Sequence, residues 1–459
     1  MATGFSFRTL LGCAALFGSL TVGMASAQPA AAPWTLLANA RVIDGSGTAP
    51  IEHAYVLLHG ATIASVSSTA PVRLASGSRV IDYSGKTILP GLIADHAHLG
   101  IVSGATFGAN NYTQAHLLQT LAQYERYGIT TLNALGLNGE LFYSLQPQMH
   151  AGTLPGADLF GADRGIGYER SAPPEALAGG RVDRVGTPAQ ARAAVDAQAA
   201  RHPTLIKIWV DDMHGTLPVK MPASISSAII DEAHRKGLRV AAHVYYLDDA
   251  MRLVAEGVDV LAHGVRDRPV DDELIAAMKA RDVWYIPTLD LDEASFIYAE
   301  HPAWMQEGFF QNALSPELRA QFADPLWRQS VLAKSHEVEV SKAALAMNER
   351  NLKTLATAGV RIGFGTDSGA MPVRIPGFAE HRELKLMVDS GLSPIMALHY
   401  ATQNAAELLG LKDRGLIAPG KLADLLVVDG NPALRIEDAD RIAAVWHRGK
   451  LVDLQAGTR

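Results

Sequence analysis

ILPGLIADHAHLG, residues 88–100, is the stretch of sequence that decides the fold. It is an apolar run that ends in His96 and His98, and histidine can bind a divalent metal. Side chains at positions i and i+2 of a β-strand point to the same face, so both imidazoles can reach one ion. A single His-x-His pair is weak support, because the chain has 16 histidines and such pairs arise by chance.

Four further apolar runs end in the same way. They are TLIKIWV (204–210), LRVAAHV (238–244), VDVLAHG (258–264) and RIGFGTDSG (361–369), and they carry Lys207, His243, His263 and Asp367. If the runs are parallel strands of one barrel, their carboxyl ends converge on one mouth, where such folds place their chemistry. The repetition therefore predicts a hydrolytic site that holds two metal ions.

Each of these residues also has a purely structural interpretation. Lys207 could extend to solvent or pair with Asp211 or Asp212, although its place in an apolar run disfavours both alternatives. His243 and His263 could be core histidines, but each stands at the end of its own strand with one helix between them. The other histidines lack such placement, and we interpret them as surface or structural residues.

Asp367 could cap a helix or stabilise a turn, because Thr366-Asp367-Ser368-Gly369 also has turn character. As a member of the set of strand-end residues, it is better interpreted as a metal ligand. The mature chain offers only nitrogen and oxygen ligands, since Cys13 is its one cysteine and lies in a segment expected to be removed.

Strand-like runs alternate with amphipathic helical segments through most of the chain, which predicts an α/β fold, a (β/α)8 TIM barrel. The expected strands are 87–95, 130–134, 157–161, 205–210, 238–243, 258–263, 283–289 and 361–366. The barrel domain is predicted over residues 89–412. A helical insertion at about 290–340 is interpreted either as a lid over the mouth or as a segment that packs on the barrel.

Both ends of the chain alternate apolar and polar residues between turn signals. Residues 34–88 and 413–459 are therefore expected to build one small β-sandwich-like domain. Residues 1–27 have the features of a signal peptide: Arg8, then an apolar stretch, then Ala25-Ser26-Ala27. Cleavage near Ala27 predicts an exported protein, periplasmic or secreted.

Charge and hydropathy exclude several classes of partner. The net charge is −7 without clusters of Lys and Arg, which argues against nucleic acid and anionic membranes. No run outside the signal peptide approaches the roughly 20 apolar residues of a membrane span. A small-molecule or dipeptide substrate is expected, and a homo-oligomer is compatible with the sequence.

The chain resembles the amidohydrolase superfamily, in the branch of imidazolonepropionase-like proteins and Xaa-Pro or Xaa-Arg dipeptidases. The resemblance covers nearly the whole mature chain. Its motifs are LPGLIADHAHL, IKIW, AAHV, LAHG and GFGTDSG in the barrel, with ARVIDGSG and GLIAPGKLADLLVVDGNP at the two ends. One departure is Ala94, where the family often has an acidic residue; Asp95 follows it, and its role is left open.

The resemblance implies a ligand set for two divalent ions, with zinc as the expected metal. It implies that His96, His98 and Asp367 bind the more buried ion and that His243 and His263 bind the more exposed one. Lys207 is implied to bridge the two ions as an N6-carboxylated lysine. The physical requirement is a neutral amine that reacts with carbon dioxide, and burial beside dications favours that form.

The activity implied is hydrolysis of the amide or peptide bond of a dipeptide or N-acyl amino acid through a metal-bridging hydroxide. Asp367 is expected to act as general base and then general acid. Substrate contacts are expected from Tyr245, Tyr246, Arg266 and Arg164 near the mouth. For the arginines, the alternative is an ordinary surface salt bridge with a nearby aspartate.

Two alternatives remain for the function. A mononuclear deaminase or cyclic-amide hydrolase of the same superfamily is the first, although deaminases generally lack the fourth-strand lysine. A non-catalytic scaffold is the second, although such members lose ligands and all six are present in this chain.

Overall fold

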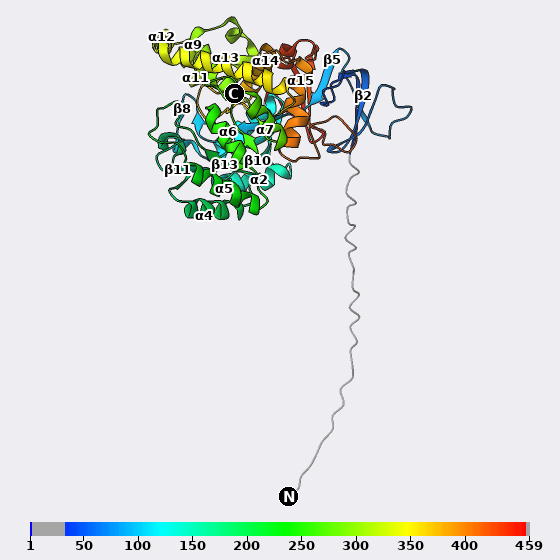
Figure 1. Ribbon diagram of the computed structural model, residues 1–459. Coiled ribbons are helices and arrows are strands. Elements are labelled where there is room, and N and C mark those ends of the chain that lie inside the picture. The colour runs from blue at the N-terminus through cyan, green and yellow to red at the C-terminus, as the bar shows by residue number, and fades with distance from the viewer. Residues whose placement is uncertain (2–32, 456–459) are drawn as a thin grey trace. The chain divides into compact units, whose positions relative to one another are not determined.

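The computed structural model describes Met1 and residues 33–455 of the 459-residue chain (Figure 1). Beyond Met1, the predicted signal peptide at residues 1–27 lies outside the described residues. Among the helices that the structure describes, none has the length and apolar character needed to cross a bilayer.

Eight parallel strands form a barrel in the order in which they occur along the chain. They are β6 (Leu92–Ala97), β9 (Ile129–Ala134), β10 (Asp158–Gly161), β13 (Ile206–Trp209), β14 (Val240–His243), β15 (Val260–Leu261), β16 (Trp284–Tyr285) and β17 (Arg361–Ile362). The amide of Asp95 donates to Phe364 O at 2.6 Å, and that of Thr204 donates to Gly161 O at 2.9 Å. These bonds link the two sheets into a closed ring, so the predicted TIM barrel is confirmed.

The helices between the strands lie on the outside of the barrel, where α4 and α5 pack side by side (Figure 1). They are α1 (Gln114–Arg126), α2 (Glu140–His150), α4 (Pro188–Ala199), α5 (Ala223–Arg235), α6 (Leu247–Glu256), α7 (Asp272–Ala280), α13 (Ser335–Thr357), α14 (Phe378–Asp389), α15 (Pro394–His399) and α16 (Ala405–Leu408), with a π-turn, η3, at Tyr400–Asn404. Their ends follow local chemistry: α4 begins with a capping box between Thr187 and Gln190, and α6 ends at Gly257 with a φ of 99°.

Short elements line the loops of the barrel. They are β7 (Val102–Ser103), β8 (Thr106–Phe107), η1 (Ala109–Asn111), β11 (Ile166–Tyr168), α3 (Glu175–Ala178) and β12 (Asp183–Val185). The strands β11 and β12 extend the barrel sheet beside β13. The loops that carry β7, β8 and α3 supply part of the wall of the cavity described below.

The first expected strand, 87–95, is two strands in the structure. Residues Lys86–Pro90 form β5, while β6 begins at Leu92. Proline has no N–H to continue a ladder, and the amide of Gly91 turns to Asp424 O at 2.8 Å. A Cβ at Gly91 would overlap the side chain of Thr130, so glycine allows the close approach at which the chain passes from one sheet to the other.

A second sheet of eight strands joins the two ends of the described chain. Its strands are β1 (Trp34–Val42), β2 (Ile51–His59), β3 (Thr62–Ser67), β4 (Arg79–Asp82), β5, β18 (Leu425–Asp429), β19 (Ile442–His447) and β20 (Lys450–Leu451), with η4 (Ile436–Asp440) before β19. Side chains alternate between its faces. Leu425 and Val427 belong to the core of this sheet, whereas Leu426 and Val428 belong to the core that includes the barrel.

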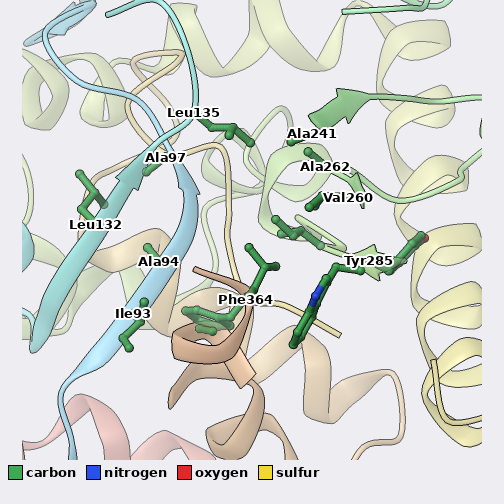
Figure 2. Close-up of a cluster of buried hydrophobic side chains, with 14 of the residues drawn as sticks. Ile93, Ala94, Ala97, Leu132, Leu135, Ala241, Val260, Ala262, Tyr285 and Phe364 are labelled. Carbon is green, nitrogen blue, oxygen red and sulfur yellow. The ribbon is translucent and has the colours of Figure 1, made fainter. Parts of the chain in front are cut away.

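The barrel interior is filled by apolar side chains from successive strands. Figure 2 shows Ala94 of β6, Val260 of β15, Tyr285 of β16 and Phe364, which follows β17, within one buried cluster. All four are at most 1% exposed. The barrel is therefore a packed core and holds its polar groups at the strand ends.

The insertion after β16 is helical. Its elements are α8 (Asp290–Glu293), α9 (Ile297–Glu300), η2 (Ala303–Gln306), α10 (Gly308–Gln311), α11 (Pro316–Ala323) and α12 (Pro325–Leu332), and α13 already begins at Ser335. Tyr298 stacks on Phe310 and Phe322, with ring centroids 5.5 and 4.7 Å apart. Phe310 packs on Phe378 of α14, and Leu291 reaches the cavity at the barrel mouth. The insertion thus both packs on the barrel and forms part of the cavity wall.

Candidate metal centre

The strand-end residues predicted as ligands lie at the carboxyl ends of five barrel strands. His96 is in β6, Lys207 is in β13 and His243 ends β14. His98, His263 and Asp367 follow β6, β15 and β17. All six side chains are buried, with exposures from 0% for His96 and Lys207 to 7% for His243.

Asp367 contacts both histidines of the first strand. Its Oδ1 lies 3.2 Å from Nε2 of His96 and 3.0 Å from Nε2 of His98. Together with His263, Asp367 and His96 form a group whose potential ligand atoms all lie within 4.8 Å of one another. Burial holds the pKa of His96 and His263 well below the usual value, so both imidazoles are neutral and can offer a lone pair.

The rings of His243 and His263 lie side by side, with centroids 4.2 Å apart. Each ring has a partner on one nitrogen. Asp211 Oδ2 lies 3.2 Å from Nε2 of His243, and Thr288 Oγ1 lies 2.9 Å from Nδ1 of His263. The opposite nitrogens, Nδ1 of His243 and Nε2 of His263, are left as the atoms able to bind a metal.

Lys207 has a buried amine with no hydrogen-bond partner among the described residues. Burial lowers the pKa of Lys207 to about 7, with Asp367 and Asp211 acting in the opposite direction. A large share of this amine is therefore neutral at neutral pH. Of the alternatives for Lys207, extension to solvent is wrong, because the side chain is 0% exposed.

The buried nitrogen and oxygen atoms of these six residues are suited to bind divalent cations. Nδ1 of His96, Nδ1 of His98 and the amine of Lys207 are buried without a hydrogen-bond partner in the described chain. Nε2 of His96 lies at ion-pair distance from Asp367 but makes no hydrogen bond with suitable geometry. Buried polar atoms of this kind are normally paired, so a cluster of them requires a partner. Imidazole nitrogens with carboxylate oxygens are ligands that zinc and related metals accept.

Asp367 has a second partner that sequence reasoning missed. Arg374, in the loop after β17, donates from Nη1 to Oδ2 of Asp367. Burial would raise the pKa of Asp367, but Arg374, His96 and His98 hold it well below its usual range. The carboxylate is ionised at neutral pH, with Oδ1 toward the histidines and Oδ2 toward Arg374. The backbone of Asp367 has a φ of 63°, a conformation that is uncommon outside glycine but that aspartate adopts more readily than most residues.

The metal centre opens into a cavity of about 420 Å³. Its walls are Phe107, Leu137, Pro174, Ala176, Leu177, Trp209, Met213, His214, Leu291, Ala370 and Met371, with His98, His243, Arg266, Asp367 and Arg374 at its polar side. A second cavity of about 320 Å³ reaches His98 from the side of α1 and the insertion.

Of the four residues predicted to contact substrate, Arg266 lines the larger cavity, whereas Tyr245, Tyr246 and Arg164 are not among its lining residues. The ring of Tyr245 packs against that of His214 at a tilt of 39°, with centroids 4.0 Å apart, and Arg266 lies 5.0 Å from the centre of the Tyr245 ring. Tyr246 donates to Asp212 at 2.9 Å. Each of the three Arg266 nitrogens already has a partner, and Nη1 contacts Asp292 at 3.1 Å.

Arg164 lies outside the wall of the cavity. Its Nε lies 3.1 Å from Asp183 Oδ1, and it also donates to Gly180 O. For this residue the structure shows the ordinary salt bridge that was the alternative interpretation. Its partner, however, is Asp183 and not an aspartate close in sequence.

Four residues at the site were missed or misjudged: Asp211, Thr288, Arg374 and His214. Asp211 follows the lysine strand by two residues and was considered only as a partner of Lys207. Thr288 has a φ of 51°, which is rare for a β-branched residue and is not visible in sequence. His214 was interpreted as surface or structural, yet it lines the cavity.

The amidohydrolase family profile matches residues 87–452. Adenine deaminase 2 of Desulfotalea psychrophila is 45% identical over 69 residues, 15% of this chain and 11% of the relative. An uncharacterised protein of Mycobacterium tuberculosis is 30% identical over 228 residues, 48% of this chain and 55% of the relative. The chain thus spans about half or less of the length of these two curated relatives.

A 5-methylthioadenosine/S-adenosylhomocysteine deaminase of Bacillus cereus is 24% identical over 412 residues, 85% of this chain and 84% of the relative. Its match runs through most of both chains, unlike the two local matches above.

Solved structures share the fold over nearly the whole chain. A Bifidobacterium longum protein provisionally named a prolidase has a TM-score of 0.72 at 25% identity, covering 92% of this chain and 95% of its own. A Xaa-Pro dipeptidase with bound methionine has a TM-score of 0.71 at 22% identity, and the match covers 91% of this chain and 99% of the dipeptidase. With the family profile, the barrel and the buried cluster of histidines and aspartate, the chain belongs to the amidohydrolase family of metal-dependent hydrolases.

Proposed function

We propose that this chain is an exported binuclear amidohydrolase that cleaves the C–N bond of a dipeptide or N-acyl amino acid. The observation that carries the proposal is the buried amine of Lys207, which lies beside the histidines and Asp367 and has no hydrogen-bond partner among the described residues. A cation in that place would be costly, whereas a carboxylated lysine would bring two anionic oxygens to two metals.

Carboxylation of Lys207 is a simple step. The neutral Nζ attacks the carbon of carbon dioxide, so that a C–N bond forms and one C=O π bond opens. One N–H proton passes to water, which leaves the carbamate anion. The pKa of about 7 supplies the neutral amine that this step needs. His96, His98, His243, His263 and Asp367 complete the proposed ligand set.

Two divalent ions would supply Lewis acidity and a water of lowered pKa. The residues of the chain would then hold the proton that this water loses and transfer it to the leaving group. Asp367 is ionised and lies at the boundary between the histidines and the cavity, so its Oδ2 can accept a proton and return it to the leaving amine. Arg374 orients that oxygen, and the apolar wall limits access of bulk water.

A deaminase is the second candidate, because two relatives carry that name. Deamination would use one metal and a heterocyclic substrate, and it would leave Lys207 without a role at the centre. The prolidase and Xaa-Pro dipeptidase structures, in contrast, favour a peptide-like substrate by the names they carry.

Zinc is the proposed metal, on the basis of a neutral histidine-rich donor set with carboxylate oxygens and no thiol. Export is proposed from residues 1–27 alone. Expression of the full chain followed by N-terminal sequencing of the mature protein tests it: a start near Gln28 is expected, and retention of Met1 would contradict export by this route.

The activity is tested with purified protein and a panel of dipeptides, N-acyl amino acids, cyclic imides, adenine and 5′-methylthioadenosine. Release of a free amino acid is expected from the first two groups. Release of ammonia from the purines alone would favour the deaminase. No turnover with any compound and no bound metal would favour the scaffold.

A further inference from the structure

The cavity at the metal centre combines a large apolar wall with one cationic group that is only partly satisfied. Seven of its side chains are large and apolar: Phe107, Leu137, Leu177, Trp209, Met213, Leu291 and Met371. They come from β13 and from the loops after six of the barrel strands, so the wall surrounds a bound group on several sides. The chemistry of this wall fits a bulky apolar side chain.

Arg374 is the cationic group that faces this cavity. Its Nη1 is engaged by Asp367, but its Nε is buried and has no partner among the described residues. A guanidinium presents five N–H donors as a planar fork, and the edge that carries Nε can hold both oxygens of a carboxylate. The orphaned Nε therefore points to a missing anionic partner.

Arg266, the other arginine at the cavity, cannot take this role. Its Nε donates to Gly264 O, its Nη2 donates to Val244 O and its Nη1 pairs with Asp292. These bonds engage all three of its nitrogens and hold it in an ion pair with Asp292. Arg374 differs because its Nε has no hydrogen-bond partner among the described residues.

The position of Arg374 also fits the covalent structure of an acylated amino acid. Arg374 touches Asp367, the proposed donor of a proton to the leaving nitrogen. In an N-acyl amino acid or dipeptide, one carbon separates that nitrogen from the free carboxylate. A group that contacts Asp367 and also lines the cavity is placed to reach this carboxylate.

We infer that Arg374 binds the free α-carboxylate of the substrate, while the apolar wall receives the side chain of the same residue. The inference rests on the proposed function and narrows it. The substrate class is a peptidyl or N-acyl α-amino acid with a large apolar C-terminal residue. Arg374 is a specificity-determining residue, distinct from the proposed metal ligands.

The experiment compares substrates in matched pairs, each with a free carboxylate or with an α-carboxamide, such as N-acetyl-L-phenylalanine and its amide. The ratio of kcat/KM for acid over amide is measured within each variant, so any effect of the substitution on Asp367 cancels. For Arg374→Gln, the ratio is expected to fall on the order of 10- to 100-fold, the value of a charged hydrogen-bonded contact.

Two further variants keep the result interpretable. Arg374→Lys preserves the charge beside Asp367, so the variant should fold. Because lysine lacks the planar guanidinium fork, the variant should retain only part of the preference for the acid over the amide. Arg361→Gln is the matched control. Arg361 begins β17, the strand that precedes the loop of Arg374; its side chain is 38% exposed and pairs with Asp282 and Glu407. Its acid-over-amide ratio should stay within about twofold of wild type.

Calorimetric binding of L-phenylalanine and L-phenylalaninamide separates the two levels of the proposal. If no amide bond is cleaved but the preference for the carboxylate is lost in Arg374→Gln, the proposed function fails and the carboxylate site stands. If amides are cleaved and the acid-over-amide ratio is unchanged in both Arg374 variants, the inference is overturned and the proposed function stands. A wild-type protein without any preference for the acid also overturns it.

Discussion

Asp211 Oδ2 lies 3.2 Å from Nε2 of His243, and both side chains are buried. Burial would raise the pKa of Asp211, but His243 and neighbouring groups lower it to about 2, so the carboxylate is ionised. An ionised carboxylate beside Nε2 restricts the ring of His243 and leaves Nδ1 as the nitrogen that can bind a metal. The contact therefore orients a proposed ligand and makes it more basic.

Asp211→Asn should weaken metal binding by about 10- to 100-fold, because the amide no longer holds the imidazole in the required tautomer and orientation. Competition with a chelator of known affinity measures this. Asp231→Asn is the control, since Asp231 is exposed on α5. Equal metal affinity in the two variants would mean that Asp211 has no part in orienting His243.

Thr288→Val should reduce metal affinity with little change in stability. Thr288 is fully buried, and its hydroxyl lies 2.9 Å from Nδ1 of His263. Valine keeps the shape and removes the hydroxyl, so the cost to folding is about 1 kcal/mol. Metal titration and urea unfolding measure the two effects. As a control, Thr354→Val at an exposed position on α13 should change neither metal affinity nor stability. If Thr288→Val lost much stability without a change in metal affinity, the hydroxyl of Thr288 would have no role in metal binding.

Gly264→Ala should destabilise the barrel by about 2–4 kcal/mol. A Cβ at Gly264 would overlap Oδ1 of Asn348, whose amide donates to Pro287 O at 2.8 Å. That bond ties α13 to the segment that leads to Thr288. Gly308→Ala is the control, because no atom of the described part of the chain lies within 4 Å of a Cβ there, and it should change stability by less than about 0.5 kcal/mol. Equal unfolding free energies for the two variants would contradict the close contact.

Asp158→Asn should show a penalty that depends on pH. Arg414 and Arg448 each donate to Oδ2 of Asp158 at 2.8 Å, and His150 Nδ1 lies 2.5 Å from Oδ1. Burial would raise the pKa of Asp158, but these three partners hold it below its usual range. A lowered folded pKa gives stability that is complete above the unfolded pKa of about 3.9 and lost as the pH falls toward the folded pKa.

The variant should therefore lose about 3–5 kcal/mol at neutral pH, the cost of breaking a buried ion pair. The difference from wild type should be constant above about pH 5 and should narrow below about pH 4. Chemical unfolding at a series of pH values measures it. If the difference in unfolding free energy between wild type and Asp158→Asn grew toward acid pH, the pKa of Asp158 would not be lowered in the folded protein.

The barrel could be predicted from sequence because its strands are short apolar runs that end in polar residues. The side chains of His96, His98, His243 and His263 are brought together by parallel strands, whose carboxyl ends lie on one side of any such barrel. Their role as ligands stays a prediction. The strand boundary at Gly91 was not predictable, since it depends on packing against Thr130, a residue of the next strand.

The contacts that orient the site could not be predicted in the same way. Asp211 faces a histidine that is 32 residues away, and Thr288 faces one that is 25 residues away. No periodicity relates such pairs. Arg374 was hidden for another reason: it lies in an irregular loop after β17, where side-chain direction follows from tertiary packing and not from strand alternation.

The most direct measurement is the metal content of Lys207→Met beside wild type and Lys236→Met, a surface lysine that pairs with Asp196. Elemental analysis should find about two divalent ions per chain in wild type and in Lys236→Met, and about one or none in Lys207→Met, together with loss of amide hydrolysis. A Lys207→Met protein with the metal content and activity of wild type would contradict the bridging role of this lysine, on which the binuclear site depends.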